Sequence, residues 1–147
     1  MEKGKNVLAI DLGASSGRAI LGSFDGKRIK LEELHRFLNE PVQLNQTLYW
    51  DVLRLMHDIK IGLQKAAQVD FHSVGIDTWG VDFGLLDEDG NLLENPVHYR
   101  DNRTEGMFEL AFSQYDKERF YELSGNQFME INTVFQLLSL RNSRQRF

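Results

Sequence analysis

The chain has 147 residues, of which 41% are hydrophobic and 27% charged, and this composition is typical of a soluble globular domain. The net charge is −5, and the basic residues form no stripe outside the last few positions, so we expect no nucleic-acid partner. There is no apolar run of membrane-spanning length and no signal-type run after the N-terminus, so we expect no membrane partner and a cytoplasmic location. The chain has no cysteine, and its four histidines lack metal-ligand spacing, so we expect neither disulfides nor a zinc site.

The first predicted element is a strand at residues 7–10 that ends at Asp11. Four apolar residues in succession are typical of a strand buried on both faces. The loop that follows, 12–17, holds two glycines and two serines and leads into Arg18. Such a loop brings backbone N–H groups, hydroxyls and a guanidinium together, which suits phosphate, and Asp11 beside it suits a hydrated Mg²⁺. The same residues are also ordinary turn chemistry, and the loop alone leaves both interpretations open.

The next segments are typical of a strand meander followed by a helix. The dipeptide Asp25-Gly26 predicts a tight turn between strands at 19–24 and 28–37. Residues 39–47 are polar and are predicted to form a loop. Asp51 is a candidate N-cap for a helix that runs to about residue 68. The apolar stripe of that helix is Val52, Leu55, Ile59, Leu63 and Ala66, and we assign it to core packing.

A strand is predicted at 69–77, with 74–76 as its buried part. A helix that connects two strands of one sheet makes those strands parallel and places the new strand beside the first. Ligands of open α/β sheets gather beyond the carboxyl ends of the strands, so Asp11 and Asp77 would face one crevice. An aspartate at a strand end is also a common turn former, so this pair alone does not establish a site.

The segment 78–82 contains Trp79 and Gly80, which together suit a sugar site. An aromatic face can cover the C–H surface of a sugar, and a glycine lets the backbone approach it. The alternative is that Trp79 fills the core and Gly80 relieves a bend. A second hairpin turn is predicted at Asp89-Gly90, and a short strand at 97–99.

The remaining residues are predicted to be mostly helical. Asp101 could form an ion pair with Arg100 or Arg103, although an exposed pair of this kind stabilises by only about 0–1 kcal/mol. Three helix starts are predicted, at Thr104, at Asp116 and at Asn132 or Thr133, and Gly125 is the expected end of the second helix.

Three motifs resemble those of the FGGY family of sugar kinases, which share the actin and hexokinase type of ATPase fold. They are D-x-G-x-x-S-x-R at 11–18, G-I-D-T-W-G-V-D-F-G-L-L-D at 75–87 and Y-R-D-N-R-T at 99–104. Within the family they look most like the rhamnulokinases. The implied fold is an α/β, RNase H-like domain with a mixed sheet: strands 1–3 as a meander, a crossover helix, a parallel strand, a hairpin insertion and C-terminal helices. Kinases of this family are considerably longer and have two domains, so residues 1–147 would be a single N-terminal domain without its C-terminal partner.

The resemblance implies an enzyme that transfers the γ-phosphate of ATP to the 1-hydroxyl of L-rhamnulose, with ATP and Mg²⁺ as cofactors. The implied contacts are ATP phosphates at Ala14, Ser15, Ser16, Gly17 and Arg18, sugar at Thr78, Trp79, Gly80 and Asp82, and Mg²⁺ through water at Asp11. Asp77 would assist with metal or structure. Ala14 stands where many relatives carry threonine, which removes one hydroxyl contact but agrees with a rhamnulokinase.

The catalytic base of the family is an aspartate of the second domain, so none of the residues of this chain is assigned that role. We therefore expect the chain alone to lack appreciable kinase activity, because half of a two-domain clamp neither orients its substrates nor excludes water. Its exposed clamp face would also be open to self-association. The alternatives are another kinase of the family (xylulokinase-, fuculokinase- or glycerol kinase-like) or a non-catalytic actin-like binding module.

Overall fold

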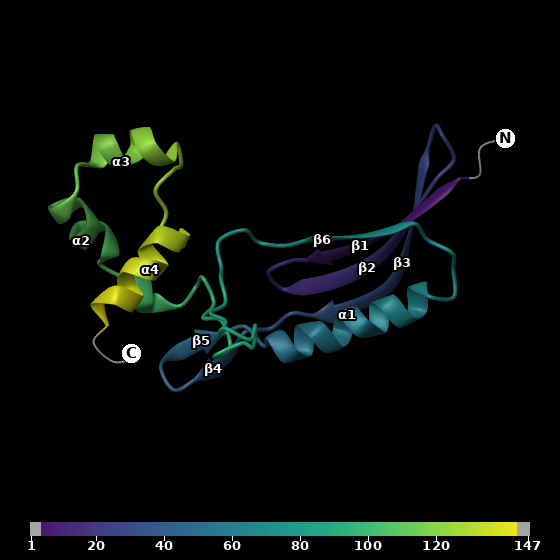
Figure 1. Cartoon of the computed structure of the whole chain (residues 1–147), viewed down its shortest axis with the longest axis horizontal. Coiled ribbons are helices and arrows are strands. Elements are labelled where there is room, and N and C mark those ends of the chain that lie inside the picture. The colour runs from purple at the N-terminus through teal and green to yellow at the C-terminus, as the bar shows by residue number, and fades with distance from the viewer. Residues whose placement is uncertain (1–3, 144–147) are drawn as a thin grey trace. The chain divides into compact units, whose positions relative to one another are not determined.

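The computed structural model describes residues 4–143, which form two compact units (Figure 1). The first unit contains the described residues up to Pro41 together with Asp51–Gly80. The second contains Val42–Trp50 together with the described residues from Val81 onward. The chain therefore leaves the first unit after Pro41, returns to it at Asp51, and leaves it again after Gly80.

The first unit is a four-stranded sheet with one helix. Its elements are β1 (Lys5–Leu12), β2 (Ser16–Phe24), β3 (Ile29–Leu38), α1 (Val52–Ala66) and β6 (Ser73–Asp77). The strand order is β3-β2-β1-β6, in which β1 is antiparallel to β2 and parallel to β6. The predicted meander, connecting helix and parallel strand are thus confirmed. The turn at Asp25-Gly26 is also confirmed, since Gly26 has a φ of 97° and the carboxylate of Asp25 accepts hydrogen bonds from two backbone N–H groups that follow it.

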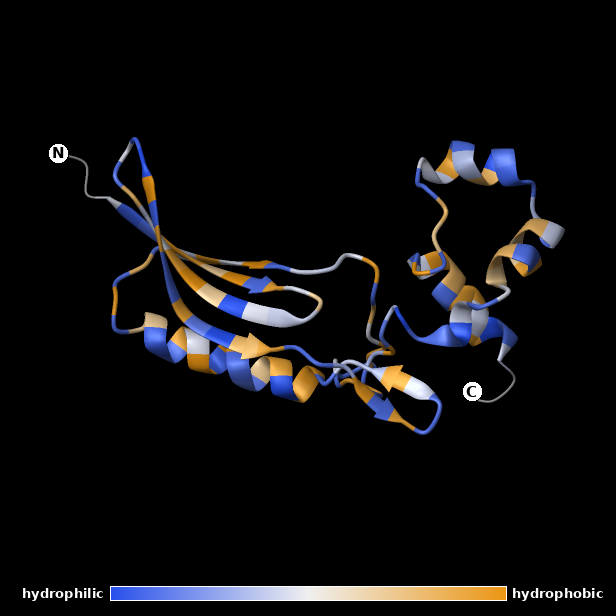
Figure 2. Ribbon diagram, turned by 180° about the vertical axis from the view of Figure 1, so that it is seen from behind, coloured by the Kyte–Doolittle hydropathy of each residue, from blue (hydrophilic) through white to orange (hydrophobic). Residues whose placement is uncertain are grey.

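Helix α1 begins where the sequence predicts, because the side chain of Asp51 accepts a hydrogen bond of 3.0 Å from the backbone N–H of Arg54. The helix packs against β1, β2 and β3 and buries Leu55, Asp58, Gly62 and Ala66, and Figure 2 shows hydrophobic and hydrophilic residues alternating along it. The buried core between helix and sheet consists of Leu8, Ile10, Ala19 and Ala66. Gly62 lets the helix approach closely, since a Cβ there would lie 2.6 Å from the Cβ of Ala19.

Two burial predictions for this sheet are wrong. Strand β1 is not buried on both faces, because Leu8 and Ile10 are buried whereas Val7 is 43% exposed and Ala9 is also exposed. All five residues of β6 are exposed, including the 74–76 segment that was predicted to be buried. The physical reason is coverage: continuous apolar runs are typical of strands with helices on both faces, and α1 covers one face of β1–β3 only.

The second unit contains a short hairpin and the C-terminal helices. Its elements are β4 (Val42–Leu44), β5 (Thr47–Tyr49), the 3₁₀ helix η1 (Asn102–Thr104), α2 (Met107–Gln114), α3 (Lys117–Ser124) and α4 (Thr133–Asn142). The prediction of a loop at 39–47 is wrong in part, because β4 and β5 pair as an antiparallel hairpin. Asn45, with a φ of 54°, supplies the left-handed residue of the turn.

The helix boundaries of this unit confirm three predictions and correct one. Helix α4 starts at Thr133 with Asn132 at its N-cap position, as predicted, although the Asn132 side chain makes no cap hydrogen bond. Asp116 caps α3 by accepting a hydrogen bond from the backbone N–H of Arg119, and Gly125 ends that helix with a φ of 64°. Thr104 does not cap α2, because it lies inside η1, which Asp101 caps, and α2 starts only after Gly106 with its φ of 74°. The predicted strand at 97–99 is reduced to a single antiparallel bridge between Tyr49 and Val97.

Aromatic rings form the core of the helical part of the second unit. Phe112 is at the centre of this cluster, with its ring centroid 5.1 Å from that of Phe128 and 5.9 Å from that of Phe120. Phe135 on α4 is fully buried and meets the ring of Phe108 edge-on at 4.6 Å. Edge-to-face pairs of this kind add to the stabilisation from apolar burial, so these contacts hold α2, α3 and α4 together.

Candidate functional site

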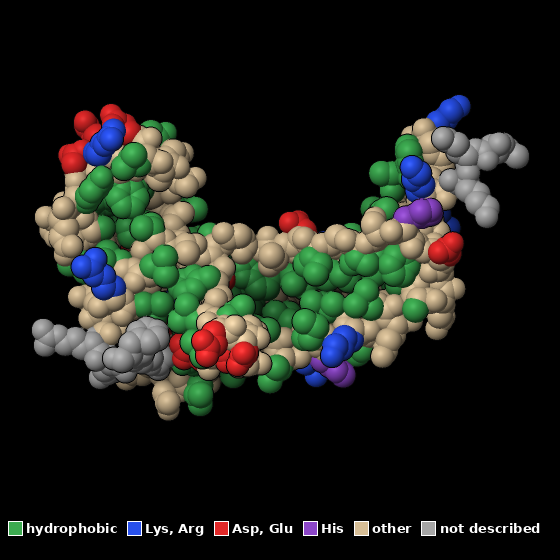
Figure 3. All heavy atoms as spheres, viewed as in Figure 1, with side chains coloured by type: hydrophobic (Ala, Val, Ile, Leu, Met, Phe, Trp, Pro, Cys, Tyr) green, Lys and Arg blue, Asp and Glu red, His purple; other side chains and the backbone are tan. Residues whose placement is uncertain are grey.

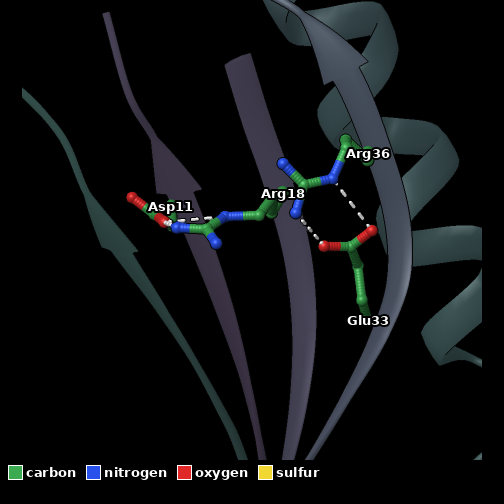
Figure 4. A network of polar contacts seen from close by, with 4 residues as sticks. All are labelled: Asp11, Arg18, Glu33 and Arg36. Carbon is green, nitrogen blue, oxygen red and sulfur yellow. Dashed lines mark hydrogen bonds and ion pairs between the residues drawn. The ribbon is translucent and has the colours of Figure 1, made fainter.

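A row of charged side chains crosses the sheet of the first unit at the carboxyl end of β1. The strand register places Asp77 beside Asp11, Asp11 beside Arg18, and Arg18 beside Arg36. Figure 4 shows that Arg18 points toward Asp11, while Arg36 pairs with Glu33 of its own strand, with 3.0 Å between Arg36 Nε and Glu33 Oε1. The sequence-based expectation that Asp11 and Asp77 end neighbouring strands is therefore confirmed by the register.

Arg18 neutralises the carboxylate that was predicted to hold Mg²⁺. Its Nε donates to Asp11 Oδ2 at 3.1 Å, and its Nη2 donates to the same oxygen. Asp11 Oδ1 has no hydrogen bond among the residues that the structure describes. Both side chains are about one-third exposed. The guanidinium therefore lies where it can reach either the carboxylate or an anion bound at the adjacent loop.

The loop between β1 and β2 is held closed by its own backbone and by Asn39. The N–H of Gly13 donates to the carbonyl of Ser16 at 2.9 Å, so this N–H is already used. The side-chain amide of Asn39 donates to the carbonyl of Gly13 at 2.7 Å, and its backbone N–H donates to the carbonyl of Ser15 at 3.1 Å. Asn39 is buried, and sequence reasoning placed it in a polar loop without a role.

Gly17 has a packing role that does not depend on any ligand. A Cβ at this position would lie 2.1 Å from the ring of Phe37 on β3, which is far closer than real contacts allow. Gly17 is buried, and its missing side chain leaves the space that the outer end of the Phe37 ring occupies. The glycine of the loop motif is thus required by the fold whether or not phosphate binds there.

The residues predicted to contact sugar are divided between the two units. Thr78, Trp79 and Gly80 belong to the first unit, and Asp82 belongs to the second. Thr78 and Gly80 are exposed, Trp79 is half-buried, and a Cβ at Gly80 would meet no atom within 4 Å. Gly80 is therefore open to the approach of another group, as a backbone contact to a ligand requires.

Asp82 is held by two side chains of the second unit. The indole Nε1 of Trp50 donates to its Oδ2, and the amide of Gln136 donates to its Oδ1 at 3.2 Å. Gln136 also donates to the carbonyls of Val81, at 3.2 Å, and of Ile131, at 2.9 Å. Sequence reasoning gave this buried glutamine no role. Its position three residues after Thr133 on α4 does not indicate that its side chain binds Asp82.

The charged segment at 100–103 binds the backbone instead of forming the predicted ion pair. The carboxylate of Asp101 accepts hydrogen bonds from the backbone N–H of Leu48 at 2.7 Å and of Arg103 at 2.9 Å. The guanidinium of Arg103 donates to the side-chain carbonyl of Gln136. Asp101 is buried and joins the β4–β5 hairpin to η1, so its role in the structure is to anchor two loops.

His98 is a fully buried histidine next to Trp50. Its ring centroid lies 3.9 Å from that of Trp50 and 4.5 Å from that of Tyr99. Its Nδ1 accepts a hydrogen bond from the backbone N–H of Arg100, so Nε2 carries the proton of the neutral ring. Nε2 has no hydrogen-bond partner among the described residues. Burial lowers the pKa of His98, which keeps the ring neutral.

Few groups of the described chain suit a metal ion. Residues 4–143 contain no cluster of three or more histidine, cysteine, aspartate or glutamate side chains that could hold one directly. A hydrated Mg²⁺ needs fewer protein ligands, and the Oδ1 of Asp11, with the carboxylate of Asp77 on the adjacent strand, fits that requirement. In the same part of the chain, no helix has both the length and the apolar character that crossing a membrane requires.

Two known proteins with similar sequences are both named rhamnulokinase. The chain is 48% identical over 138 residues to a rhamnulokinase from Oceanobacillus iheyensis. The matched region covers 92% of this chain and 29% of the relative. It is 45% identical over 141 residues to a rhamnulokinase from Bacteroides thetaiotaomicron, covering 95% of this chain and 29% of the relative. The chain thus spans less than a third of the length of these relatives.

Solved structures show the same fold at low sequence identity. The gluconate kinase from Lactobacillus acidophilus superposes with a TM-score of 0.77 at 16% identity, over 96% of this chain and 29% of that chain. The xylulose kinase from the same organism gives a TM-score of 0.77 at 17% identity, over 95% and 29%. These matches confirm the actin and hexokinase type of α/β fold. A sequence model of the N-terminal domain of the FGGY family matches residues 6–147, and the chain therefore belongs to the FGGY family of carbohydrate kinases.

Proposed function

We propose that this chain is the N-terminal part of a kinase that transfers the γ-phosphate of ATP to the 1-hydroxyl of L-rhamnulose, in the breakdown of rhamnose in the cytoplasm. The observation that carries the proposal is the 45–48% identity to proteins named rhamnulokinase over more than nine-tenths of the chain. The solved structures at 16–17% identity support the fold and do not bear on the sugar.

The geometry supports a phosphate-handling role for the first unit. In the proposed arrangement the loop from Ala14 to Arg18 binds the ATP phosphates, and Asp11 holds Mg²⁺ through water. When bound, Mg²⁺ supplies positive charge that offsets the negative charge of the transferring phosphoryl group. Arg18 donates to Asp11 and lies next to the loop. When ATP binds, Arg18 would release the carboxylate of Asp11 and donate to a phosphate oxygen.

The proposed sugar site uses Gly80 as an open backbone position beside the half-buried ring of Trp79, with Thr78 on one side. Asp82 is the fourth proposed contact, and its carboxylate is fixed by Trp50 and Gln136 before any sugar arrives. A carboxylate held in one orientation by two donors discriminates between hydroxyl positions better than a mobile one does.

The catalytic base is proposed to lie in a second domain, so residues 1–147 would act only as one half of an enzyme. Reaction therefore requires a complementing domain that supplies the base and closes over the substrates. Without that domain the chain is proposed to be inactive. The surface that would face the second domain is proposed to be exposed to solvent. Measurable turnover of L-rhamnulose by the pure chain would contradict this part of the proposal.

The test is a coupled assay of ADP release with L-rhamnulose and Mg-ATP. The chain is mixed with a separately expressed C-terminal domain from one of the rhamnulokinase relatives. We expect sugar-dependent ADP release that Asp11→Asn abolishes and that Asp70→Asn, an exposed aspartate of the same unit, leaves intact. Release with another ketose or polyol in place of L-rhamnulose would reassign the substrate. Nucleotide binding without transfer to any sugar would favour a binding module.

A further inference from the structure

The proposed phosphate loop, residues 12–17, would bind an anion largely through its own backbone. Figure 3 shows that apolar side chains predominate over the sheet of the first unit on the face that this view presents, with few lysines or arginines among them. Backbone N–H groups bind an anion well when several of them point to one side and the neighbouring carbonyls point elsewhere. Anion binding at this loop therefore depends on whatever sets the direction of its peptide groups.

Three carbonyl groups of the loop accept hydrogen bonds from donors of the first unit. The carbonyl of Gly13 accepts from the side-chain amide of Asn39 at 2.7 Å, and that of Ser15 accepts from the backbone N–H of Asn39 at 3.1 Å. The carbonyl of Ser16 accepts from the N–H of Gly13 at 2.9 Å. A Cβ at Gly13 would lie 2.9 Å from this last carbonyl oxygen, so the bond depends on the glycine. All three carbonyls are thus turned toward groups of the protein itself.

The direction of each carbonyl fixes the direction of the N–H group that follows it. The described chain has no cis peptide bond, and the C=O and N–H of a planar trans peptide point to opposite sides. The carbonyls of Gly13 and Ser15 both point toward Asn39. The N–H groups of Ala14 and Ser16, on the far side of the same two peptide groups, therefore point away from it. The N–H groups of Ala14 and Ser15 donate no hydrogen bond among the residues that the structure describes, which leaves them available to a ligand.

The side chain of Asn39 replaces one of the two hydrogen bonds that close a tight hairpin. With two turn residues, the flanking residues Gly13 and Ser16 would each donate to the carbonyl of the other. The bond from the N–H of Gly13 is present, but the carbonyl of Gly13 accepts from Asn39 Nδ2 and not from the N–H of Ser16. Asn39 is only 4% exposed, so water competes little for this amide. The N–H of Ser16 is thereby released from the turn.

We infer that Asn39 is a positioning residue of the phosphate site: its side-chain amide holds the carbonyl of Gly13 and so directs the loop N–H groups toward the phosphates of ATP. The inference rests on the phosphate-binding role proposed above for this loop. Asn39 lies on the opposite side of these peptide groups from the N–H groups, so it acts through the backbone and does not touch the ligand. Without the amide, the carbonyl of Gly13 would accept from the N–H of Ser16, and that donor would be lost to the anion.

The first test is an NMR titration of the full chain with tripolyphosphate, which carries the phosphate chain of ATP without its nucleoside. We expect the amide signals of Ala14 and Ser16 to shift in the parent chain. Asn39→Ala removes the side-chain donor, keeps the backbone N–H, and should raise the dissociation constant at least about tenfold. Asn39→Leu removes the same donor but keeps a side chain of similar shape, so it should weaken binding as much. An effect of lost packing would appear in the alanine variant alone.

Asn6→Ala is the matched control for these variants. The side-chain amide of Asn6 donates to the carbonyl of Asp70 at 2.9 Å, which is the same kind of bond at the other end of β1. Its loss should leave the dissociation constant for tripolyphosphate unchanged.

The second readout is the ADP-release assay with the separately expressed C-terminal domain. Asn39→Ala and Asn39→Leu should raise the KM for ATP and leave the KM for L-rhamnulose unchanged, whereas a smaller folded fraction would lower kcat and leave both KM values unchanged.

Three results would overturn the inference. They are loop amides that do not shift in the parent chain, an Asn39→Leu chain that binds tripolyphosphate like the parent, and an Asn6→Ala chain that is weakened as much as the Asn39 variants. A parent mixture that transfers no phosphate to L-rhamnulose would contradict the proposed reaction, while the titration would still decide the role of Asn39.

Discussion

Asp58 on α1 and His35 on β3 form a buried contact between the helix and the edge of the sheet, with 3.1 Å between Asp58 Oδ1 and His35 Nε2. Asp58 is only 2% exposed, and its second oxygen accepts a hydrogen bond of 2.8 Å from Arg54, one turn earlier on the helix. The other ring nitrogen of His35 lies 3.3 Å from Nζ of Lys65. The carboxylate therefore holds the helix to a strand that is 23 residues earlier in the chain.

We expect this contact to make the chain sensitive to acid. Burial alone would raise the pKa of Asp58, but hydrogen bonds from His35 and Arg54 hold it below its ordinary value. A carboxyl whose pKa is lower in the folded state stabilises the fold above its unfolded pKa of about 3.9. That stabilisation is lost as the pH falls through the folded-state pKa. Urea unfolding at neutral pH and at about pH 3 measures the loss.

The matched variants for this prediction are Asp58→Asn and Asp70→Asn. The first removes the titrating group and should reduce the loss in the free energy of unfolding on acidification. The second changes an exposed aspartate and should leave that loss as it is in the parent chain. An Asp58→Asn chain with the parent's pH dependence would show that Asp58 does not contribute.

The close approach of α1 to the sheet at Gly62 predicts that a larger residue is not tolerated there. Alanine is the better helix former by about 1 kcal/mol. However, its Cβ would lie 2.6 Å from the Cβ of Ala19, and overpacking of this kind costs about 1–3 kcal/mol. We expect Gly62→Ala to lower the free energy of unfolding and Gly62→Val to lower it further. Gly80→Ala, where a Cβ meets open space, is the control, and a stabilised Gly62→Ala would refute the prediction.

Replacement of Gln136 should destabilise the second unit. Gln136→Leu keeps the approximate volume but removes the acceptor of the Arg103 guanidinium and the donor to Oδ1 of Asp82, whose Oδ2 still accepts from Trp50. Each unsatisfied buried group costs about 1–3 kcal/mol. In a Trp79→Phe background, Trp50 is the remaining tryptophan, so its fluorescence reports unfolding of this unit. Gln64→Leu, on the exposed side of α1, should have little effect, and equal effects of the two substitutions would count against the role of Gln136.

His98 should remain neutral at pH values where a free histidine is protonated. Burial lowers its pKa from the ordinary value of about 6.5. Since the unfolded state then binds protons more readily than the folded state, stability should fall as the pH drops below that value. NMR titration of the ring carbons in the folded chain, with the urea-unfolded chain as reference, measures the shift. The ring ¹⁵N shifts should show the proton on Nε2, and a charged ring at pH 6 would contradict the burial argument.

Local chemistry made much of the fold predictable from the sequence. Asp51 and Asp116 cap helices through contacts three residues away, and the turn at Asp25-Gly26 follows from backbone geometry alone. The exposure of β6 was not predictable, because an apolar strand has the same sequence whether or not another element covers it. The β4–β5 hairpin was missed since its strands are three residues long and its turn lacks glycine.

The candidate site was predictable only where its residues are neighbours in the sequence or lie opposite each other on adjacent strands. The neighbourhood of Asp11, Arg18 and Asp77 follows from strand order, which the hydrophobic pattern indicates. Gln136 reaches Asp82 across 54 residues of sequence, and Asn39 reaches Gly13 across 26. Such partners depend on how distant elements pack, and a glutamine or asparagine in a polar stretch gives no sign of it.

Because Asn39 fastens the loop at both Gly13 and Ser15, the backbone of that loop is ordered by the end of β3 before any anion arrives. A phosphate bound there would not have to freeze a mobile segment, and less of its binding free energy would be consumed by lost chain entropy. The affinity of the loop for the proposed phosphate would thus be linked to the stability of β3. Any change that frays the end of that strand would weaken binding without touching a residue of the loop.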